Sequence, residues 1–163
     1  MGAGSDRSHA RNSDELRALL RELMALNLVL AEFGERAAAR LRVTRRDLVA
    51  LTAVVEHEQV TAGYIGDLVG LTSGAATGVI NRLEAAGYAS RQANPRDARS
   101  VVVAPTPEGV RALEDLWQDA THALRQGLEV APRARVGDLL DCVRVADAAL
   151  KNGSPLLHRR VRD

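Results

Sequence analysis

The sequence predicts a mainly α-helical protein with a small β-hairpin near its centre. Apolar residues make up 46% of the chain but aromatic residues only 2%, so Leu, Val and Ala must form most of the core, which favours helices. Between residues 61 and 107, helix-capping residues and glycines delimit two short helices, and two β-prone runs follow them. Long segments with apolar residues at helical spacing lie on both sides of this centre.

The composition limits the classes of function. The chain has 163 residues, a length typical of one domain, and a formal net charge of +1, so any nucleic-acid surface must be local. The single cysteine, Cys142, excludes a disulfide framework and a multi-thiolate metal site within one chain. A signal-peptide core and an apolar run of about 18 residues are both missing from the sequence, so we expect a cytoplasmic protein without a membrane segment.

The N-terminal part should contain one long amphipathic helix. Residues 1–12 are small, polar or charged, cannot bury apolar surface, and therefore predict a disordered arm. Ser13 is a suitable N-cap with acidic residues directly after it. Leucines then recur at helical spacing, which predicts a helix within residues 13–43.

Two short helices should follow. Thr44 and Asp47 have the spacing of a capping box, with Asp in place of the usual Glu, and predict a helix that ends near His57. Thr61 is the expected N-cap of the next helix. That helix should end at Gly70, because glycine adopts the left-handed conformation of a helix C-terminus without strain.

A further helix and a hairpin complete the centre of the chain. Thr72 is expected to cap a helix that ends at Gly87, so only a few residues separate it from the preceding helix, as in a helix-turn-helix. Residues 88–92 and 100–103 have strand character. The loop between them contains the turn signal Asn94-Pro95, which predicts a hairpin with a charged tip.

Two helices should form the C-terminal part, within residues 107–151. Thr106 is the expected N-cap of the first, with Pro107 at the favoured first helical position. Pro132 should begin the second, which Asn152-Gly153 would end. Residues 152–163 are expected to form a flexible tail.

The helix after Thr72 has two contrasting faces. Its buried stripe should contain Ala76, Val79, Ile80 and Leu83. The opposite face combines small residues with hydrogen-bonding side chains, namely Gly74, Thr77, Gly78, Asn81 and Arg82. Such a face can approach the floor of a DNA major groove, where Asn pairs with adenine and Arg with guanine, while Ser73 and Thr77 could reach bases or phosphates. The alternative is that the glycines serve close helix packing and the polar residues are simply solvated.

The charge is polarised toward this face and the hairpin. Residues 72–105 contain four arginines and two acidic residues, whereas residues 44–71 contain two arginines and four acidic residues. Arg96 and Arg99 are candidates for entering a narrow minor groove or bridging phosphates. Asp97, which DNA would repel, is expected to hold Arg99 or the loop in position. The alternative for this loop is an ordinary solvated turn.

The run LVGLTSGAATGVINRLEAAGYASRQANPRDARSVVVAPTPEG resembles the winged helix-turn-helix core of MarR-family transcriptional regulators, including the wing motif Asp97-Ala98-Arg99. The resemblance implies a DNA-binding lobe over residues 44–106 and a homodimer whose interface is formed by Ser13–Leu41 and Pro132–Lys151. It also implies that the fourth helix enters the major groove and that a wing arginine enters the minor groove. The expected DNA contacts are Thr72, Ser73, Gly74, Ala75, Thr77, Gly78, Asn81, Arg82, Arg91, Arg96 and Arg99.

Two positions depart from the family pattern. Many members have a basic residue where Gly78 stands, so readout of DNA shape is expected to matter more here than direct base contact. The usual Leu-Thr after the wing is Pro105-Thr106, which keeps the helix cap.

The resemblance also implies release of DNA by a small aromatic or anionic effector. Phe33, His57, Tyr64 and Trp117 are the candidates for lining its pocket, although at helical spacing such residues are also ordinary core. Cys142 is expected to be an inert buried thiol. The histidines lack ligand spacing, so we expect neither a metal nor another cofactor.

The sequence therefore predicts a dimeric, sequence-specific transcriptional regulator that binds a pseudo-palindrome in double-stranded DNA and represses a neighbouring gene. The alternative is a winged-helix protein-interaction module without sequence-specific DNA binding. An enzyme is not expected, because the sequence lacks a Ser/His/Asp order, a glycine-rich phosphate loop after a strand, and paired acids in a plausible cleft.

Overall fold

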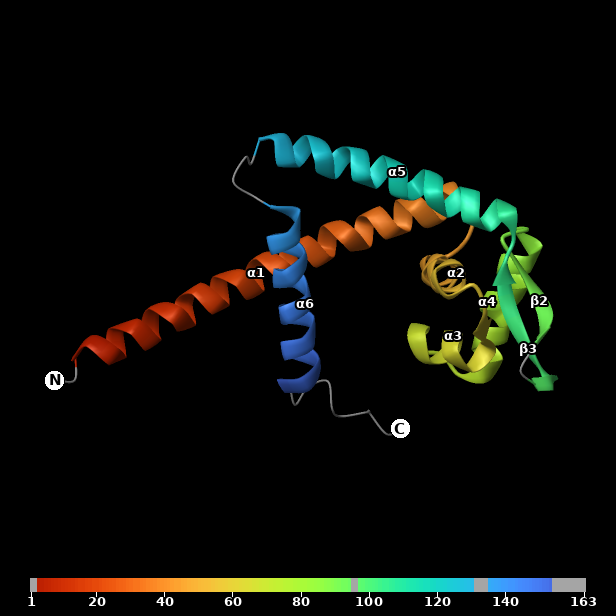
Figure 1. The fold of residues 1–163 in the computed structure, drawn as a ribbon, viewed down its shortest axis with the longest axis horizontal. Coiled ribbons are helices and arrows are strands. Elements are labelled where there is room, and N and C mark those ends of the chain that lie inside the picture. The colour runs from red at the N-terminus through yellow and green to blue at the C-terminus, as the bar shows by residue number, and fades with distance from the viewer. Residues whose placement is uncertain (1–2, 95–96, 131–134, 154–163) are drawn as a thin grey trace. The chain divides into compact units, whose positions relative to one another are not determined.

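A computed structural model describes residues 3–94, 97–130 and 135–153 of the chain. The chain divides into two compact units, Met1–Leu116 and Trp117–Asp163. The elements follow the order α1 (Ala3–Arg40), α2 (Arg45–His57), β1 (Val60–Thr61), α3 (Ala62–Val69), α4 (Ser73–Ala85), β2 (Ala89–Asn94), β3 (Asp97–Pro105), α5 (Pro107–Glu129) and α6 (Val136–Gly153) (Figure 1). The predicted fold class, mainly helical with a small hairpin, is confirmed.

Helix α1 is longer at its N-terminus than the sequence predicted. It begins at Ala3, so residues 3–12 belong to the helix and are not a disordered arm, and Ser13 lies inside it instead of capping it. The segment contains no proline, and its alanines and arginines are good helix formers that can extend a helix without burial. At its other end α1 stops at Arg40, before the predicted boundary at residue 43. Its last turns bury Ala37 and Ala38.

The predicted ends of α2 and α3 are confirmed. Asp47 N–H donates to Thr44 Oγ1 at 3.3 Å and Thr44 N–H donates to Asp47 Oδ2 at 2.9 Å, which completes the capping box. Thr61 Oγ1 accepts from Tyr64 N–H at 3.2 Å, and Gly70 ends α3 with a φ of 66°. For α4 the prediction was partly wrong, because Thr72 has the backbone conformation of an N-cap but its side chain makes no capping bond.

The core of the first unit lies where α2, α3, α4 and the sheet meet. The predicted stripe of α4 is confirmed: Ala76, Val79, Ile80 and Leu83 are all buried. Leu51 and Val54 of α2, Ile65 of α3 and Val103 of β3 complete this core. Burial of so many Leu, Val and Ile side chains fixes which face of α4 points inward, and therefore which face it presents to solvent.

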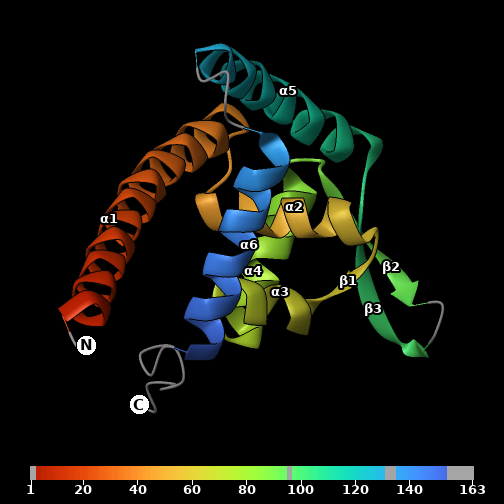
Figure 2. The ribbon, with the colours of Figure 1, turned by 60° about the vertical axis from the view of Figure 1, so that its left-hand side comes forward.

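The sheet has three antiparallel strands in the order β1-β3-β2, one more than the sequence predicted (Figure 2). The additional strand pairs Val60 with Val103 and Thr61 with Val102. Two residues are too few to show a strand periodicity, which is why β1 could not be predicted. The hairpin strands are also longer than predicted, and a bulge lies between Ala93 and Asn94. The predicted turn at Asn94-Pro95 extends beyond the described residues.

Thr106 joins the sheet to α5. Its hydroxyl donates to the Gly87 carbonyl at 2.6 Å and accepts from Gly109 N–H at 3.0 Å, which confirms the predicted cap. Thr106 N–H also donates to the Tyr88 carbonyl at 3.1 Å. Gly109 is buried against the backbone of Tyr88, so this junction leaves no room for a side chain on α5.

The second unit contains the end of α5 and helix α6. The predicted start of the last helix at Pro132 lies outside the described residues. The predicted tail began too early, because Asn152 and Gly153 belong to α6, and its remainder from residue 154 lies outside the described residues. Cys142 is exposed on α6, so the expectation of a buried thiol was wrong. Among the helices described, none has the length and apolar character needed to cross a membrane.

We predict that Gly109→Ala lowers the free energy of unfolding by about 1–3 kcal/mol, because overpacking forces the backbone apart. A Cβ at this position would lie 2.9 Å from the Tyr88 carbonyl carbon. Gly127→Ala is the matched control on the same helix, since a Cβ there meets nothing within 4 Å. It should stabilise the helix by up to about 1 kcal/mol. Urea unfolding of both variants measures the difference, and equal effects would contradict the close packing at Gly109.

Candidate nucleic-acid interface

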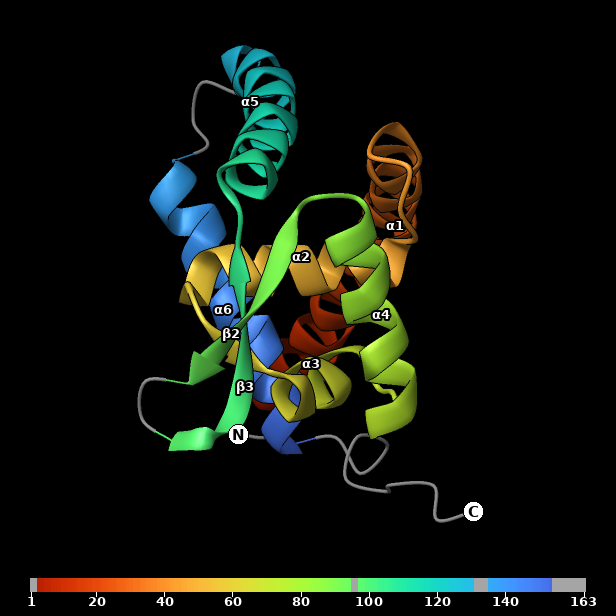
Figure 3. The same ribbon diagram turned by 90° about the vertical axis from the view of Figure 1, so that its right-hand side faces the viewer.

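The outer face of α4 is open and small, as the sequence predicted. Gly74, Ala75, Thr77 and Asn81 are exposed, while Gly78 is half-buried. A Cβ on Gly74 would meet nothing within 4 Å, and one on Gly78 would meet only the Arg82 guanidinium, at 3.5 Å. Within the first unit, the glycines therefore do not serve close helix packing. Their effect is to keep side-chain bulk off the outer face of α4, whose course Figure 3 shows.

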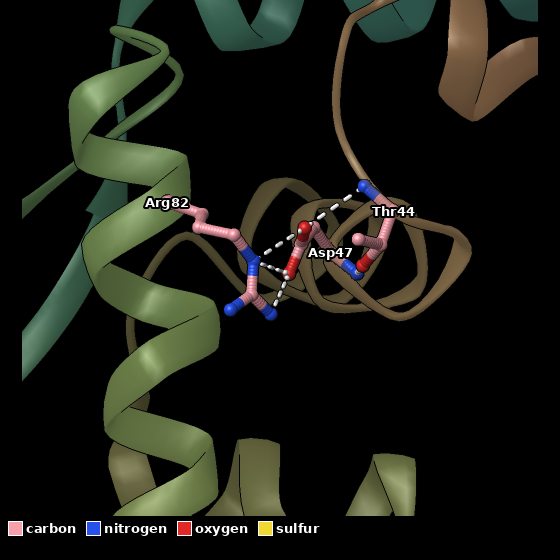
Figure 4. A network of polar contacts seen from close by, with 3 residues as sticks. All are labelled: Thr44, Asp47 and Arg82. Atoms are coloured by element: carbon pink, nitrogen blue, oxygen red, sulfur yellow. Dashed lines mark hydrogen bonds and ion pairs between the residues drawn. The ribbon is translucent and has the colours of Figure 1, made fainter.

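Arg82 has a protein partner that the sequence analysis missed. Its Nε donates to Oδ1 and Oδ2 of Asp47, with N···O distances of 3.1 and 2.9 Å, and its Nη2 donates to Oδ1 at 2.7 Å (Figure 4). The Asp47 side chain is 0% exposed, whereas that of Arg82 is 50% exposed. The edge of the guanidinium that carries Nε and Nη2 is thus occupied by a carboxylate, and a DNA contact by the exposed remainder of Arg82 stays a prediction.

The contacts of Asp47 explain how a charged group can be buried here. Burial alone would raise the pKa of this carboxyl, but hydrogen bonds from Arg82 and Thr44 and the positive charge of Arg82 outweigh that effect. The pKa of Asp47 therefore lies below its ordinary value, and the side chain is a carboxylate at neutral pH. The same hydrogen bond raises the pKa of Arg82. The pair forms a charge-assisted link between the first turn of α2 and the last turn of α4.

Arg91 on β2 is also paired. Its backbone N–H donates to Glu84 Oε1 at 2.9 Å, its Nη1 contacts Glu84 Oε2, and its Nη2–H donates to Asn81 Oδ1 at 2.8 Å. The sequence analysis placed Arg91 and Asn81 on the DNA surface as separate contacts. The structure brings them together and places the acidic Glu84 beside them.

These two ion pairs change the expected distribution of charge. Of the four arginines between residues 72 and 105, Arg82 faces Asp47 and Arg91 faces Glu84. The other two arginines, Arg96 and Arg99, belong by sequence to the predicted loop between the hairpin strands. Arg96 lies outside the described residues. For Ser73, Asp97 and Arg99 the structure describes the backbone, in α4 and β3, but not the side chain.

A groove of about 1010 Å³ lies beside α4 and was not predicted. It is lined by Glu35, Thr44, Arg45, Arg46, Val49, Leu68, Val69, Leu71, Ala75, Gly78 and Arg82. A second cavity of about 580 Å³ lies on the side of Arg82 that faces Leu41 and Tyr88. Arg82 and Thr44 line both cavities, whereas Asp47 lines only the second.

The predicted effector residues do not line either cavity. His57 and Tyr64 contact each other, with Nε2 and the phenolic oxygen 3.0 Å apart and the two rings edge to face. Phe33 lies on α1 and is exposed. Trp117 begins the second unit. The structure therefore places two of the four residues, His57 and Tyr64, in contact with each other.

Two helices across a tight turn, followed by a hairpin that completes a three-stranded sheet, define the winged helix-turn-helix class. Residues 43–100 match the sequence profile of the MarR family. Over 91 residues the chain is 35% identical to an uncharacterised HTH-type transcriptional regulator of Bacillus subtilis, YcgE, covering 56% of this chain and 59% of that protein. Over 70 residues it is 33% identical to an organic hydroperoxide resistance transcriptional regulator of the same organism, covering 43% and 48%.

The fold agrees with that match. A solved MarR-family transcription regulator superimposes with a TM-score of 0.70 at 20% sequence identity, covering 88% of this chain and 93% of that one. Residues 43–100 thus match the MarR family model, and the fold that contains them is that of a winged helix. It spans roughly half of the length of the two curated relatives, 59% and 48%.

We predict unequal losses of stability when the two members of the Asp47–Arg82 pair are replaced. Arg82→Met leaves a buried carboxylate without its counter-charge and should cost about 3 kcal/mol or more. Asp47→Asn leaves a half-exposed guanidinium that water can solvate, and should cost only about 1–2 kcal/mol. Urea unfolding at one fixed protein concentration gives both values. Equal losses, or a larger loss for Asp47→Asn, would contradict the burial asymmetry.

The lowered pKa of Asp47 predicts a specific dependence of stability on pH. In the unfolded chain this carboxyl takes up its proton near its ordinary value of 3.8, but in the folded chain only at lower pH. Its contribution is therefore complete above that value and is lost as the pH falls through the folded pKa. The difference in unfolding free energy between wild type and Asp47→Asn should be constant from about pH 5 to 7 and shrink below about pH 4. A difference that grew on acidification would rule this out.

Proposed function

We propose that this chain is a sequence-specific DNA-binding transcriptional regulator that acts in the cytoplasm and catalyses no reaction. The observation that carries the proposal is the open face of α4, where Gly74, Ala75, Thr77 and Asn81 are exposed within a MarR-family winged helix. The curated relatives are both described as transcriptional regulators. The alternative, a protein-interaction module, would favour a face with large apolar or aromatic anchors. This face of α4 has none.

In the proposed complex, α4 lies in the major groove. Small side chains at positions 74, 75 and 78 let the helix backbone approach the base edges, while Thr72, Ser73 and Thr77 supply hydroxyl groups for phosphates or bases. Arg96 and Arg99 extend from the wing toward the minor groove, supported by Asp97. Because Arg82 and Arg91 have acidic partners, the wing arginines supply most of the net charge that meets DNA.

We infer that the regulator is a homodimer that binds a pseudo-palindrome. Helix α1 exposes a long series of large apolar side chains, which include Leu16, Leu20, Met24, Leu28 and Val29. Helix α6 exposes Val136, Leu139, Leu140 and Val143. Apolar surface on this scale is typical of a surface that a partner covers. A mass of one 17.5 kDa chain in sedimentation equilibrium at micromolar concentration would contradict the dimer.

We also propose that the regulator represses a neighbouring gene and that a small aromatic or anionic ligand releases it. The exposed pair of His57 and Tyr64 supports such a site, because it offers one aromatic surface and two hydrogen-bonding groups at the end of α2. Phe33 and Trp117 stay candidates for the same pocket.

We predict that Arg99→Ala lowers the slope of log affinity against log salt concentration by about one unit, because one phosphate contact releases about one counterion. The measurement is fluorescence anisotropy with a duplex from the chain's own upstream region at several salt concentrations. Arg111→Ala is the matched control, an exposed arginine on α5 outside the family match. It should leave the slope unchanged. Salt-independent binding, or no binding of any duplex, would contradict the proposed function.

A further inference from the structure

The contact between Arg91 and Asn81 fixes which way the Asn81 amide faces. Arg91 Nη2 lies 2.8 Å from Asn81 Oδ1. A guanidinium has only hydrogen-bond donors, so the amide atom that faces it must be the oxygen. The amide nitrogen of Asn81 therefore points away from Arg91. The orientation follows from the chemistry of the pair, although the two ends of an amide are similar in shape.

Arg91 is itself held in place from two directions. Glu84, one turn after Asn81 on α4, accepts a hydrogen bond from the Arg91 backbone at 2.9 Å and also contacts its guanidinium. Arg91 belongs to β2, where it pairs with Val103 of β3. The Arg91 side chain is only 35% exposed. A strand of the wing thus sets the geometry of a residue on the outer face of α4.

This arrangement changes what Asn81 can recognise in a major groove. Bidentate contact with adenine requires the amide oxygen to accept from N6–H and the amide nitrogen to donate to N7. In this chain one lone pair of the oxygen faces a positive guanidinium, and the end of the amide that points away from Arg91 carries the N–H donors. Guanine presents two neighbouring acceptors, N7 and O6, and no donor in the major groove.

We propose that Arg91 is a specificity-determining positioning residue that turns the donor end of the Asn81 amide outward, so that Asn81 selects guanine over adenine. The inference rests on the proposed function, in which α4 lies in the major groove. It assigns Arg91 a role through Asn81 and not through a phosphate. It also assigns Glu84 the role of holding Arg91. A carboxylate beside Arg91 would repel a phosphate, which argues against a phosphate contact by this arginine.

The test is selection of bound sequences from a randomised duplex pool, for wild type, Asn81→Ala and Arg91→Met. The position whose preference disappears in Asn81→Ala identifies the base pair that Asn81 contacts. Wild type should prefer G·C over A·T there by roughly tenfold, the discrimination typical of a good base contact. Arg91→Met should shift that one position toward A·T by a similar factor. Arg91→Lys, which keeps a donor, should retain most of the G·C preference.

Two controls separate this role from charge and from folding. Glu84→Gln removes the negative charge but leaves the contact between Arg91 and Asn81, so it should keep the G·C preference. Replacing the contacted guanine by 7-deazaguanine, which lacks the N7 acceptor, should weaken wild type but not Asn81→Ala. Circular dichroism melts confirm that each variant is folded at the assay temperature.

The outcomes distinguish this inference from the proposed function. An A·T preference of the wild type at the Asn81-dependent position, an unchanged profile in Arg91→Met, or no Asn81-dependent position would overturn the role of Arg91. In each of these cases wild type would still enrich defined sequences. A wild-type protein that enriches no sequence at all would overturn the proposed function as well.

Discussion

The ion pair between Asp47 and Arg82 is the interaction on which the candidate interface depends. Asp47 takes part in two structures at once, because it closes the capping box of α2 with Thr44 and grips the guanidinium on α4. Burial of a carboxylate is costly unless its oxygens are hydrogen-bonded and its charge is matched. Arg82 and Thr44 meet both conditions, and so the first turn of α2 fixes the end of α4.

The pair also decides how charge is distributed on the surface. Arg82 and Arg91 belong to the same DNA-facing segment by sequence, yet each is bound to a carboxylate. In the proposed complex, α4 therefore presents shape and hydrogen-bonding groups, while the wing supplies the electrostatic attraction. This proposed division suits a chain whose net charge is +1, because the attraction to DNA must then come from a local group of basic residues.

Much of the fold could be predicted from the sequence because it depends on local rules. The caps at Thr44, Thr61 and Thr106 and the stop at Gly70 follow from residue type and spacing, and the buried stripe of α4 follows from helical period. The partner of Arg82 could not be predicted. The contact joins residues that lie 35 positions apart in the sequence, and the capping box alone already accounted for an aspartate at position 47. The one available indication of a further partner was that the capping box uses only one of the two oxygens of the Asp47 carboxylate.

Other misses have similar causes. Strand β1 is defined by its pairing with β3, for example of Val60 with Val103, and a local sequence pattern cannot reveal a pairing between distant segments. The start of α1 was misplaced because residues 3–12 have no apolar face, and the helix nevertheless extends through them. For Asn81, sequence placed the residue on the outer face, but only the contact with Arg91 gives the direction of its amide. Residue type thus predicted which face of α4 is exposed, and in the proposed complex the tertiary contacts of that face set what the helix can distinguish.

The central claim is that the pair of buried Asp47 and half-exposed Arg82 positions α4 for specific recognition in the proposed complex. The most direct test is the ratio of specific to nonspecific DNA affinity for Asp47→Asn, measured where the variant is shown to be folded. Asp47 is 0% exposed and cannot contact DNA itself. We expect the ratio to fall by roughly tenfold, equal to about 1.4 kcal/mol, while the salt dependence of nonspecific binding stays the same. An unchanged ratio would contradict the claim.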